Sequence, residues 1–525
     1  MLPNSLAEKQ SLKGAAFALL FLCWCTLLAG CALPSLQHRT ESVALDVDTA
    51  SETRLGQALE SQLIVNGGKS GIHALRDPYD AFVVRELLTE VAEKTLDIQY
   101  YIWRKDVTGL LLLEALQKAA ERGVRVRLLL DDNGTRGLDA ELVALDQHPN
   151  IEVRLFNPFV VRKPRWLGFI TDFSRANRRM HNKSFTADNM VTIVGGRNIG
   201  DEYFGAADGL LFVDLDVLAV GPVVDEVSRD FDRYWASESA YPVADILPEL
   251  SERRIRRMVN RSSLVDRDPA AAAYRQAIAD SDFLQTLLVE GLDLEWASTR
   301  MVSDDPAKGL GHAEPEARVS SQLKEIIGIP EREVLLISPY FVPTAAGTEA
   351  FADIAGAGVD IRILTNSLDA TDVAAVHAGY AKRRRDLLRS GIRLYEMRRL
   401  TPDRERQKVV GPLGSSGSSL HAKTYSVDGE RVYVGSFNFD PRSINLNTEL
   451  GFVIDSEALA KQIRDAFVDN IPQSAYEVRF DDLGRIQWLE RRGNETIIHR
   501  REPNTSVLKR AGVFLLSILP IEWLL

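Results

Sequence analysis

Cysteine is almost absent from this 525-residue chain. Its three cysteines, Cys23, Cys25 and Cys31, all lie in the first 31 residues. The rest of the chain can therefore hold neither a disulfide framework nor a metal site built on thiolates. The sequence contains no other strong metal-binding cluster either. We expect the protein to need no metal and no cofactor.

An excess of positive charge is also missing. The chain has 63 Lys and Arg residues against 74 Asp and Glu residues, which gives a net charge of −11 and a pI near 5.4. Broad nucleic-acid binders carry a basic face and a high pI, so we expect no nucleic-acid partner. Hydrophobic residues at 45% and charged residues at 26% exclude wholesale disorder. The length suggests about three domains of roughly 150 residues each.

The amino-terminal apolar run is too short for a membrane span. It covers residues 15–28, whereas a span needs about 20 apolar residues. Lys9 and Lys13 precede the run, and small residues follow it. A basic start, a short apolar stretch and a small-residue exit together predict an export signal.

The end of this segment, Leu-Ala-Gly-Cys at Cys31, resembles the lipobox of bacterial lipoproteins. That resemblance implies a signal peptide over residues 1–31, lipid attachment at Cys31 and a polar tether over residues 32–69. The body of the protein would then be anchored to the inner or the outer bacterial membrane and face the periplasm. An uncleaved anchor helix is the alternative, and it also places the body outside the cytoplasm.

The body of the chain contains the same order of elements twice. Strands that alternate with helices predict an α/β fold with a largely buried sheet. The expected first half covers residues 70–300 and the second covers residues 326–480, joined by a turn-rich linker at 301–325. The predicted strand, helix and strand lie at 96–103, 109–122 and 124–130, and again at 334–341, 346–357 and 359–364. A C-terminal segment at 481–525 ends in a short apolar stretch that predicts either an interfacial helix or a buried terminal helix.

One motif occurs in both halves with identical spacing. It reads His-x-Lys, four residues, Asp, and six residues later a Gly-Gly or Gly-Ser pair followed by x-Asn. The first copy consists of His181, Lys183, Asp188 and Asn198, and the second, 240 residues further on, of His421, Lys423, Asp428 and Asn438. Two such copies in two similar α/β segments indicate a duplicated functional unit.

These residue types suit chemistry on phosphodiesters. A histidine can attack phosphorus or protonate a leaving oxygen, because its pKa lies near neutrality. A lysine two residues along a strand shares the histidine's face and can hold phosphoryl oxygens, and the asparagines can donate to the same oxygens. Each histidine needs a carboxylate that fixes its tautomer. We expect Glu449 to serve His421, and Asp214, or alternatively Asp216, to serve His181.

Together these residues resemble the phospholipase D superfamily, and the chain is most similar to its bacterial cardiolipin synthases, especially the C type. The resemblance implies two homologous α/β/α sandwich halves with pseudo-two-fold symmetry and one shared active site. It also implies that one histidine, by analogy His181, forms a phosphohistidine while His421 acts as acid and base. Asp188 and Asp428 would shape turns.

The same resemblance implies the reaction. A phosphatidyltransferase of this kind would make cardiolipin from phosphatidylglycerol and a second phospholipid, with phosphatidylethanolamine as the candidate donor. Hydrolysis as in a phospholipase D is the alternative, and a nuclease-type phosphodiesterase is a weaker one. A membrane surface would be the partner. Two basic stretches, residues 162–183 and 382–408, predict contact with anionic lipid, and a solvated charged face is the alternative.

Overall fold

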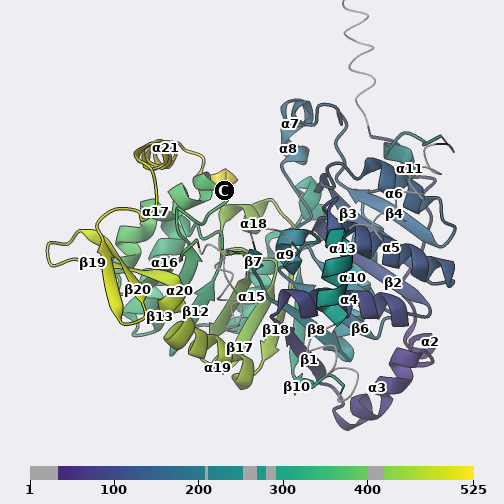
Figure 1. Ribbon diagram of the computed structural model, residues 1–525, viewed down its shortest axis with the longest axis horizontal. Coiled ribbons are helices and arrows are strands. Elements are labelled where there is room, and N and C mark those ends of the chain that lie inside the picture. Colours follow the sequence, from purple (N-terminus) through teal and green to yellow (C-terminus); the bar gives the residue numbers. More distant parts are fainter. Residues whose placement is uncertain (1–32, 207–210, 252, 254–268, 280–290, 400–417) are drawn as a thin grey trace, which may run out of the picture.

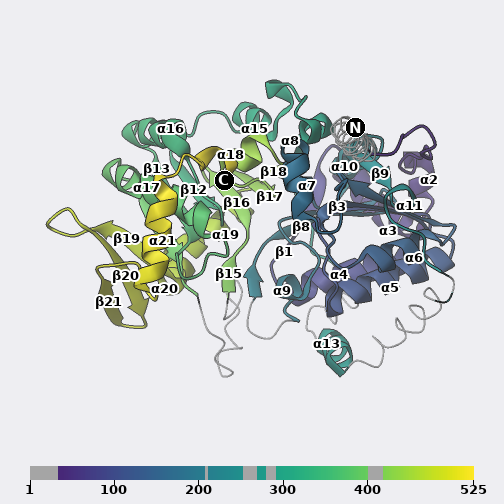
Figure 2. The same cartoon turned by 90° about the horizontal axis from the view of Figure 1, so that it is seen from above.

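The computed structural model describes residues 33–206, 211–251, 253, 269–279, 291–399 and 418–525. The predicted signal peptide and its Cys31 lie outside the described residues, as does part of the basic stretch 382–408. Figures 1 and 2 show two α/β halves that lie side by side. No helix in the described part of the chain is both long enough and apolar enough to cross a membrane.

Each half is built on one mixed sheet. Among the described residues, the first has nine strands in the order β10-β1-β8-β6-β5-β2-β3-β4-β9. These strands are β1 (Ser70–Leu75), β2 (Thr95–Ile102), β3 (Arg125–Gly134), β4 (Ile151–Phe156), β5 (Ser184–Ala187), β6 (Val191–Gly195), β8 (Asp216–Val220), β9 (Ala240–Pro242) and β10 (Glu295–Ala297). The second sheet has ten strands in the order β11-β18-β17-β16-β12-β13-β14-β19-β20-β21. These are β11 (Thr299–Ser303), β12 (Glu333–Ile337), β13 (Asp360–Asn366), β14 (Arg393–Met397), β16 (Lys423–Val427), β17 (Arg431–Gly435), β18 (Leu450–Asp455), β19 (Ala475–Phe480), β20 (Ile486–Arg492) and β21 (Glu495–His499).

The two sheets share one topology. The order β8-β6-β5-β2-β3-β4-β9 in the first corresponds to β18-β17-β16-β12-β13-β14-β19 in the second. In both, the three central strands are parallel and the motif strand pairs antiparallel to the first of them. The structure therefore confirms the predicted α/β fold of two homologous halves. A separate two-stranded parallel sheet joins β7 (Leu211–Val213) to β15 (Ser418–Leu420) across the halves.

Helices cover the sheets. In the first half they are α2 (Val47–Ser51), α3 (Arg54–Val65), α4 (Pro78–Val91), α5 (Val107–Glu121), α6 (Asp139–Asp146), α7 (Trp166–Thr171), α8 (Phe173–Ala176), α9 (Asp201–Phe204), α10 (Pro222–Trp235), α11 (Val243–Ile246) and α13 (Pro269–Ala279). In the second they are α15 (Val319–Ile327), α16 (Thr344–Gly356), α17 (Ala374–Arg389), α18 (Pro441–Asn445), α19 (Glu457–Asp465), α20 (Ile471–Ser474) and α21 (Val507–Ile518). The remaining short elements of the described residues are the 3-10 helices η1 (Pro306–Leu310), η2 (Pro315–Ala317) and η4 (Glu522–Leu524) and the π-helix η3 (Ala466–Asn470).

Helix α5 shows how local sequence sets these elements. The Asp106 side chain accepts a hydrogen bond from Gly109 N at 3.1 Å and so caps the first turn. Gly123 follows the helix with φ of 98°, a left-handed conformation that favours glycine. Between these ends, leucines recur on the side that faces the sheet. The predicted helix 109–122 is thereby confirmed as Val107–Glu121.

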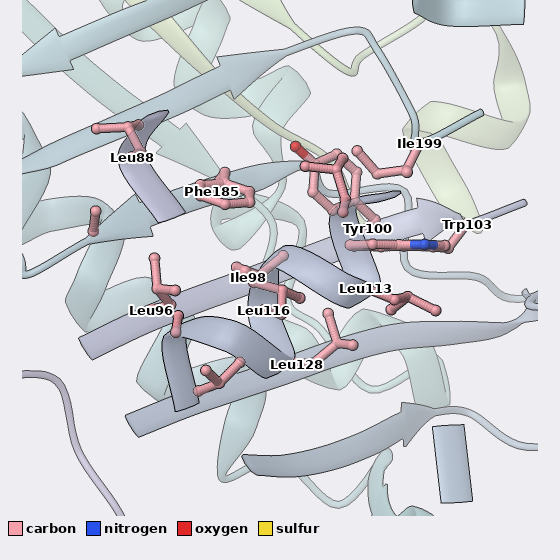
Figure 3. Packing of buried hydrophobic residues seen from close by; sticks show 14 of the residues in the cluster. Leu88, Leu96, Ile98, Tyr100, Trp103, Leu113, Leu116, Leu128, Phe185 and Ile199 are labelled. Carbon is pink, nitrogen blue, oxygen red and sulfur yellow. The ribbon is translucent and has the colours of Figure 1, made fainter. Parts of the chain in front are cut away.

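The core of the first half lies between β2, β3 and the helices above them. Figure 3 shows Leu96 and Ile98 of β2 packed with Leu113 and Leu116 of α5 and with Leu128 of β3. All five are buried, and each such side chain contributes about 1.5–3 kcal/mol relative to exposure. An equivalent cluster covers the outer face of the second sheet.

A further cluster joins the halves. It contains Val194, Val217, Val223 and Val227 from the first half and Leu335, Ile337, Val434, Leu450, Leu459 and Ile463 from the second. Because this cluster draws on both sheets, the two halves are packed as one unit, and polar groups along the same junction are held in place.

The predicted boundaries need three corrections. Residues 33–69 are not a free tether, because they contain α2 and α3, and the Arg39 guanidinium donates to Ser237 O at 2.6 Å. Residues 301–325 are not a loose linker, because β11 is an edge strand of the second sheet and α15 follows it. The crossing between halves falls at Ser298, between β10 and β11. Residues 481–525 are partly sheet, since β20 and β21 extend it before α21 begins.

Candidate active site

Both motif histidines are held by backbone contacts with the opposite half. His181 lies just before β5, and its N–H donates to Thr448 O at 2.8 Å, in the segment before β18. His421 lies just before β16, and its N–H donates to Val213 O at 2.8 Å, at the end of β7. In each case the residue after the acceptor carries a carboxylate. These backbone hydrogen bonds therefore place a carboxylate of each half beside the histidine of the other half.

The carboxylate pairing is crossed between the halves. His181 Nδ1 lies 2.7 Å from Glu449 Oε2, and His421 Nδ1 lies 2.6 Å from Asp214 Oδ2. The predicted pairs, Glu449 with His421 and Asp214 with His181, are wrong. The alternative partner, Asp216, instead accepts from the Arg85 guanidinium at 2.7 Å. Each carboxylate comes from the half opposite its histidine. The reason is that the segment before β18 bonds to the backbone of His181, and the end of β7 bonds to the backbone of His421.

The two half-sites form one centre. Burial lowers the pKa of His181 well below its ordinary value, and the charges of Lys183, Lys423 and His421 lower it further. The second half's lysine and histidine thus act on the first half's histidine. Burial and the Lys423 charge likewise lower the pKa of His421 to about 4, against the opposing pull of Asp214. Both rings are therefore held neutral at pH 7.

Both lysines are buried beside the histidines. Lys183 Nζ donates to His181 O at 2.6 Å, and Lys423 Nζ lies 3.1 Å from His421 Nε2. Burial lowers the pKa of Lys183 to about 7 and that of Lys423 to about 8, with Glu449 and Asp214 acting in the opposite direction. An anionic phosphoryl group would supply the charge that such desolvated ammonium groups favour.

The two carboxylates differ in environment although they do the same structural task. Glu449 also accepts from Ser436 Oγ at 2.5 Å and Ser443 Oγ at 2.8 Å, and burial raises its pKa to about 7 despite the nearby Lys183 charge. For Asp214, burial acts to raise the pKa, but the charges of His421 and Lys423 prevail and lower it. The site is symmetric in residue type and asymmetric in charge.

The motif aspartates lie away from this centre. Asp188 is buried and accepts from three successive backbone N–H groups, Glu93, Lys94 and Thr95, at 2.8–2.9 Å. Asp428 does the same for Glu331, Arg332 and Glu333. Both have positive φ, 51° and 56°. Their carboxylates hold a turn at the start of the neighbouring strand and do not contact the histidines.

The asparagines occupy unequal positions. Asn198 Nδ2 donates to the Tyr203 hydroxyl at 3.0 Å, and its Oδ1 accepts from Ile102 N at 3.1 Å. Asn438 Oδ1 is buried and has no hydrogen-bond partner among the described residues. Only one N–H of Asn198 is left for a phosphate oxygen, so the two asparagines are not equivalent as phosphate ligands.

The glycines of the motif make room for carboxylates. A Cβ at Gly196 would lie 2.0 Å from Asp214 Oδ1, and one at Gly195 would lie 2.1 Å from Asp216 Oδ1. In the second half, Ser436 occupies the place of Gly196 and uses its hydroxyl to bind Glu449. Gly196 and Ser436 therefore serve the carboxylates that hold the histidines, whereas Gly195 leaves room for Asp216, the partner of Arg85.

Aromatic rings that do not belong to the repeated motif line the site. The Tyr101 ring lies 5.0 Å from the His181 ring, and the Tyr203 and Phe212 rings each lie 5.2 Å from the His421 ring. Alternation along β2 would have put Tyr101 on the site face. Nothing in the sequence points to Tyr203. Within the described residues, no group of three or more His, Cys, Asp or Glu side chains is arranged to hold a metal ion.

The fold consists of two equivalent halves, and one His-x-Lys segment from each half contributes to a single buried centre. This arrangement is that of a two-domain protein that transfers phosphodiester groups. The family described as "Cardiolipin synthase, PLD-like domain" matches residues 86–235 and 323–471, which is more than half of the chain. The protein belongs to this family.

Individual relatives support the same assignment. Cardiolipin synthase C of Escherichia coli (strain K12) is 51% identical over 475 residues, which cover 90% of this chain and 100% of that protein. A Staphylococcus aureus (strain N315) cardiolipin synthase is 25% identical over 77% of this chain and 68% of its own length. The crystal structure of phosphatidylserine synthase from Haemophilus influenzae Rd KW20 superposes with a TM-score of 0.52 at 15% identity, over 81% of this chain and 92% of that one. The last similarity shows the fold.

Proposed function

We propose that this protein is a phosphatidyltransferase that makes cardiolipin from phosphatidylglycerol and a second phospholipid, with phosphatidylethanolamine as donor. The observation that carries the proposal is the single buried centre in which two histidines, each bonded to a carboxylate, lie beside two lysines. The similarity to cardiolipin synthase C over the whole length of that relative supports the substrate class.

The first half-reaction would be carried by His181. Its Nδ1–H donates to Glu449, which leaves the Nε2 lone pair free to attack the donor phosphorus. The bond between phosphorus and the headgroup oxygen breaks, and His421, protonated when the anionic phosphodiester is bound, passes its proton to the departing alcohol. Lys183 and Lys423 hold the phosphoryl oxygens as charge builds. The product is a phosphatidyl group on His181.

The second half-reaction reverses these roles. Neutral His421 accepts the proton of the glycerol hydroxyl of phosphatidylglycerol, and that oxygen attacks the phosphorus. The bond to His181 Nε2 breaks and cardiolipin leaves. Water in place of the glycerol hydroxyl would give phosphatidic acid, the hydrolytic alternative. Asp214, whose pKa is lowered by His421 and Lys423 against the effect of burial, would stabilise the protonated His421 in both steps.

Mass spectrometry of products from labelled phosphatidylglycerol and phosphatidylethanolamine tests the reaction. Cardiolipin and free ethanolamine are expected, and His181→Ala should abolish both. Phosphatidic acid alone would assign hydrolysis. No lipid product, combined with cleavage of DNA without added metal, would assign a nuclease-type phosphodiesterase and refute the proposal.

We also propose that the protein is exported and lipid-anchored at Cys31, facing the periplasm. The Leu-Ala-Gly-Cys ending and the short apolar run support this. Labelling cells with a tagged fatty acid should mark the wild-type protein, and Cys31→Ser should lose the label. A label that survives this change would refute lipidation at Cys31.

A further inference from the structure

Helix α21 carries its apolar side outward. The residues on its exposed side are Val507, Leu508, Ala511, Phe514, Leu515, Ile518 and Leu519. Leu508 is 84% exposed, Phe514 65% and Leu515 64%. The opposite side holds Val513 and Leu516, which pack against the second half. A surface helix normally buries its apolar stripe, so this helix is built to meet something apolar outside the chain.

The apolar side of α21 is fixed in that orientation. Glu502, which precedes the helix, accepts from the Arg384 guanidinium at 2.8 Å and lies 3.3 Å from His377 Nε2, both on α17. Arg383 on the same helix pairs with Glu522 beyond α21. Both ends of the segment are thus tied to α17, and α21 cannot turn its apolar side inward without breaking ion pairs.

A second exposed apolar element comes from the first half. On α7 and α8, Trp166 is 60% exposed, Ile170 69% and Phe173 44%. Phe169, between them, packs its ring 5.2 Å from the Phe159 ring and anchors the element. Figure 1 shows α7, α8 and α21 on the same, upper side of the molecule, and in Figure 2 the C-terminus lies between them.

Arg442 connects both elements to the active site. Its guanidinium donates to Asn177 O at 2.7 Å, at the end of α8, and to Leu524 O at 3.1 Å, near the C-terminus. The next residue, Ser443, donates its hydroxyl to Glu449, the carboxylate that holds His181. The end of α8 and the C-terminus are therefore both bonded to Arg442, whose neighbour Ser443 contacts the catalytic centre.

The charges beside α21 favour an anionic partner. A shallow groove of about 700 Å³ at the start of the helix is lined by Arg500, Arg501 and Arg510. Its one carboxylate, Glu502, is already paired with Arg384. Some of the basic residues for which the sequence predicted lipid contact have partners within the protein, since Arg162 and Arg165 pair with Asp132.

We propose that α7–α8 and the segment from α21 to the C-terminus form one docking face for the surface of a phospholipid bilayer with anionic headgroups. The inference rests on the proposed function, because a phosphatidyltransferase draws its substrates from such a surface. With 12 residues, α21 is about 18 Å long, so it lies along the interface. The two apolar elements would enter the bilayer on either side of Arg442.

Tryptophan quenching tests insertion independently of activity. The full chain is bound to vesicles of phosphatidylglycerol and phosphatidylethanolamine with brominated acyl chains. Quenching is expected to fall in Trp523→Phe, near the C-terminus, and in Trp166→Phe. The matched control is Trp296→Phe on β10, a strand that Figure 1 shows on the opposite, lower side of the molecule. It should leave the quenching unchanged. Equal quenching in all three variants would overturn the proposal.

Activity supplies the second test. The double variant Phe514→Glu with Leu515→Glu should lose about tenfold or more activity on vesicles, because two large apolar side chains no longer enter the bilayer. Its activity on monomeric short-chain phosphatidylethanolamine and phosphatidylglycerol should stay unchanged. The control, Ile64→Glu with Val65→Glu on α3, alters side chains that are 74% and 81% exposed and should affect neither substrate.

The outcomes separate the two proposals. Loss on both substrates by the α21 variant would overturn the docking face and assign α21 a structural role. A wild-type protein that turns over neither substrate would refute the proposed function, while the quenching still reports docking. A third outcome is that the wild-type protein is a dimer, the α21 variant is not, and brominated lipid quenches no tryptophan. The partner of the docking face would then be a second copy of the chain and not a bilayer.

Discussion

Replacing Glu449 by glutamine removes a carboxylate from the second half and should slow the step carried out by His181 in the first. Glu449 accepts from His181 Nδ1 at 2.7 Å and from the hydroxyls of Ser436 and Ser443. The amide side chain would keep the volume but lose the charge and one acceptor oxygen. A buried hydrogen bond to a charged group is worth about 1.5–3 kcal/mol, which corresponds to a rate loss of roughly 10- to 150-fold.

Asp214→Asn is the counterpart and should slow the second half-reaction more than the first. Asp214 holds His421 and stabilises the charge that this ring gains when it accepts the glycerol proton, so the phosphatidyl group should reach His181 but leave it slowly. The assay is rapid quenching after mixing with phosphorus-labelled phosphatidylethanolamine and unlabelled phosphatidylglycerol, followed by measurement of acid-labile, base-stable phosphohistidine. Glu449→Gln should delay its formation, and Asp214→Asn should make it accumulate.

Ser443→Ala is the matched control, because it removes one neutral hydrogen bond to Glu449 and leaves the histidine contact in place. Its effect should be a few-fold at most, from a net contribution of about 1 kcal/mol. If instead phosphohistidine accumulated in Glu449→Gln and formed slowly in Asp214→Asn, the roles of the two histidines would be reversed. His421 would then be the nucleophile, and His181 the acid and base. Wild-type rates for both steps in both variants would refute the reasoning altogether.

Three further predictions concern stability and geometry. Burial lowers the pKa of Lys183 to about 7 from an ordinary value near 10.5, which corresponds to about 5 kcal/mol. The unfolded chain binds more protons between about pH 7 and 10.5, so stability rises with pH there, and below pH 7 the penalty is complete. Lys183→Met should therefore raise the free energy of unfolding most at pH 6 and least at pH 10, as measured by denaturant titration. The control is Lys382→Met, which changes an exposed side chain. Equal effects of Lys183→Met at both pH values would contradict the prediction. Asp188→Ala should cost about 2–4 kcal/mol, since three backbone donors lose their acceptor, and an unchanged thermal midpoint would argue against that role. Gly196→Ala should displace Asp214 and reproduce the accumulation of phosphohistidine expected in Asp214→Asn. Rapid quenching measures the amount of phosphohistidine. Normal turnover would show that a displaced Asp214 still supports His421.

Local pattern was sufficient to locate both half-sites. The His-x-Lys alternation and the 240-residue repeat identify His181, Lys183 and their counterparts, because strand geometry acts over a few residues. The partner carboxylates were recognised by type, but their assignment failed. His181 and Glu449 are 268 residues apart, and the crossing depends on how two finished sheets pack, which no local spacing encodes.

The surface was less predictable than the core. The tail pattern allowed either an interfacial or a buried helix, and only the packing of Val513 against the second half shows which side faces out. Charge counts were misleading for a similar reason. Arg384 and Arg385 lie in a basic stretch, yet Arg384 is buried between Glu396 and Glu502, and Arg385 donates to Gly484 O.

The crossed pairing makes catalysis dependent on completing the whole chain. The ribosome makes the segment with His181 and Lys183 long before the segment that contains Glu449. Until the second half has folded against the first, His181 has no carboxylate to hold its ring, and His421 has none without the first half. A partly made or truncated chain therefore cannot attack the phospholipids around it. Two fragments cut at Ser298 should each be inert and should regain activity only when mixed.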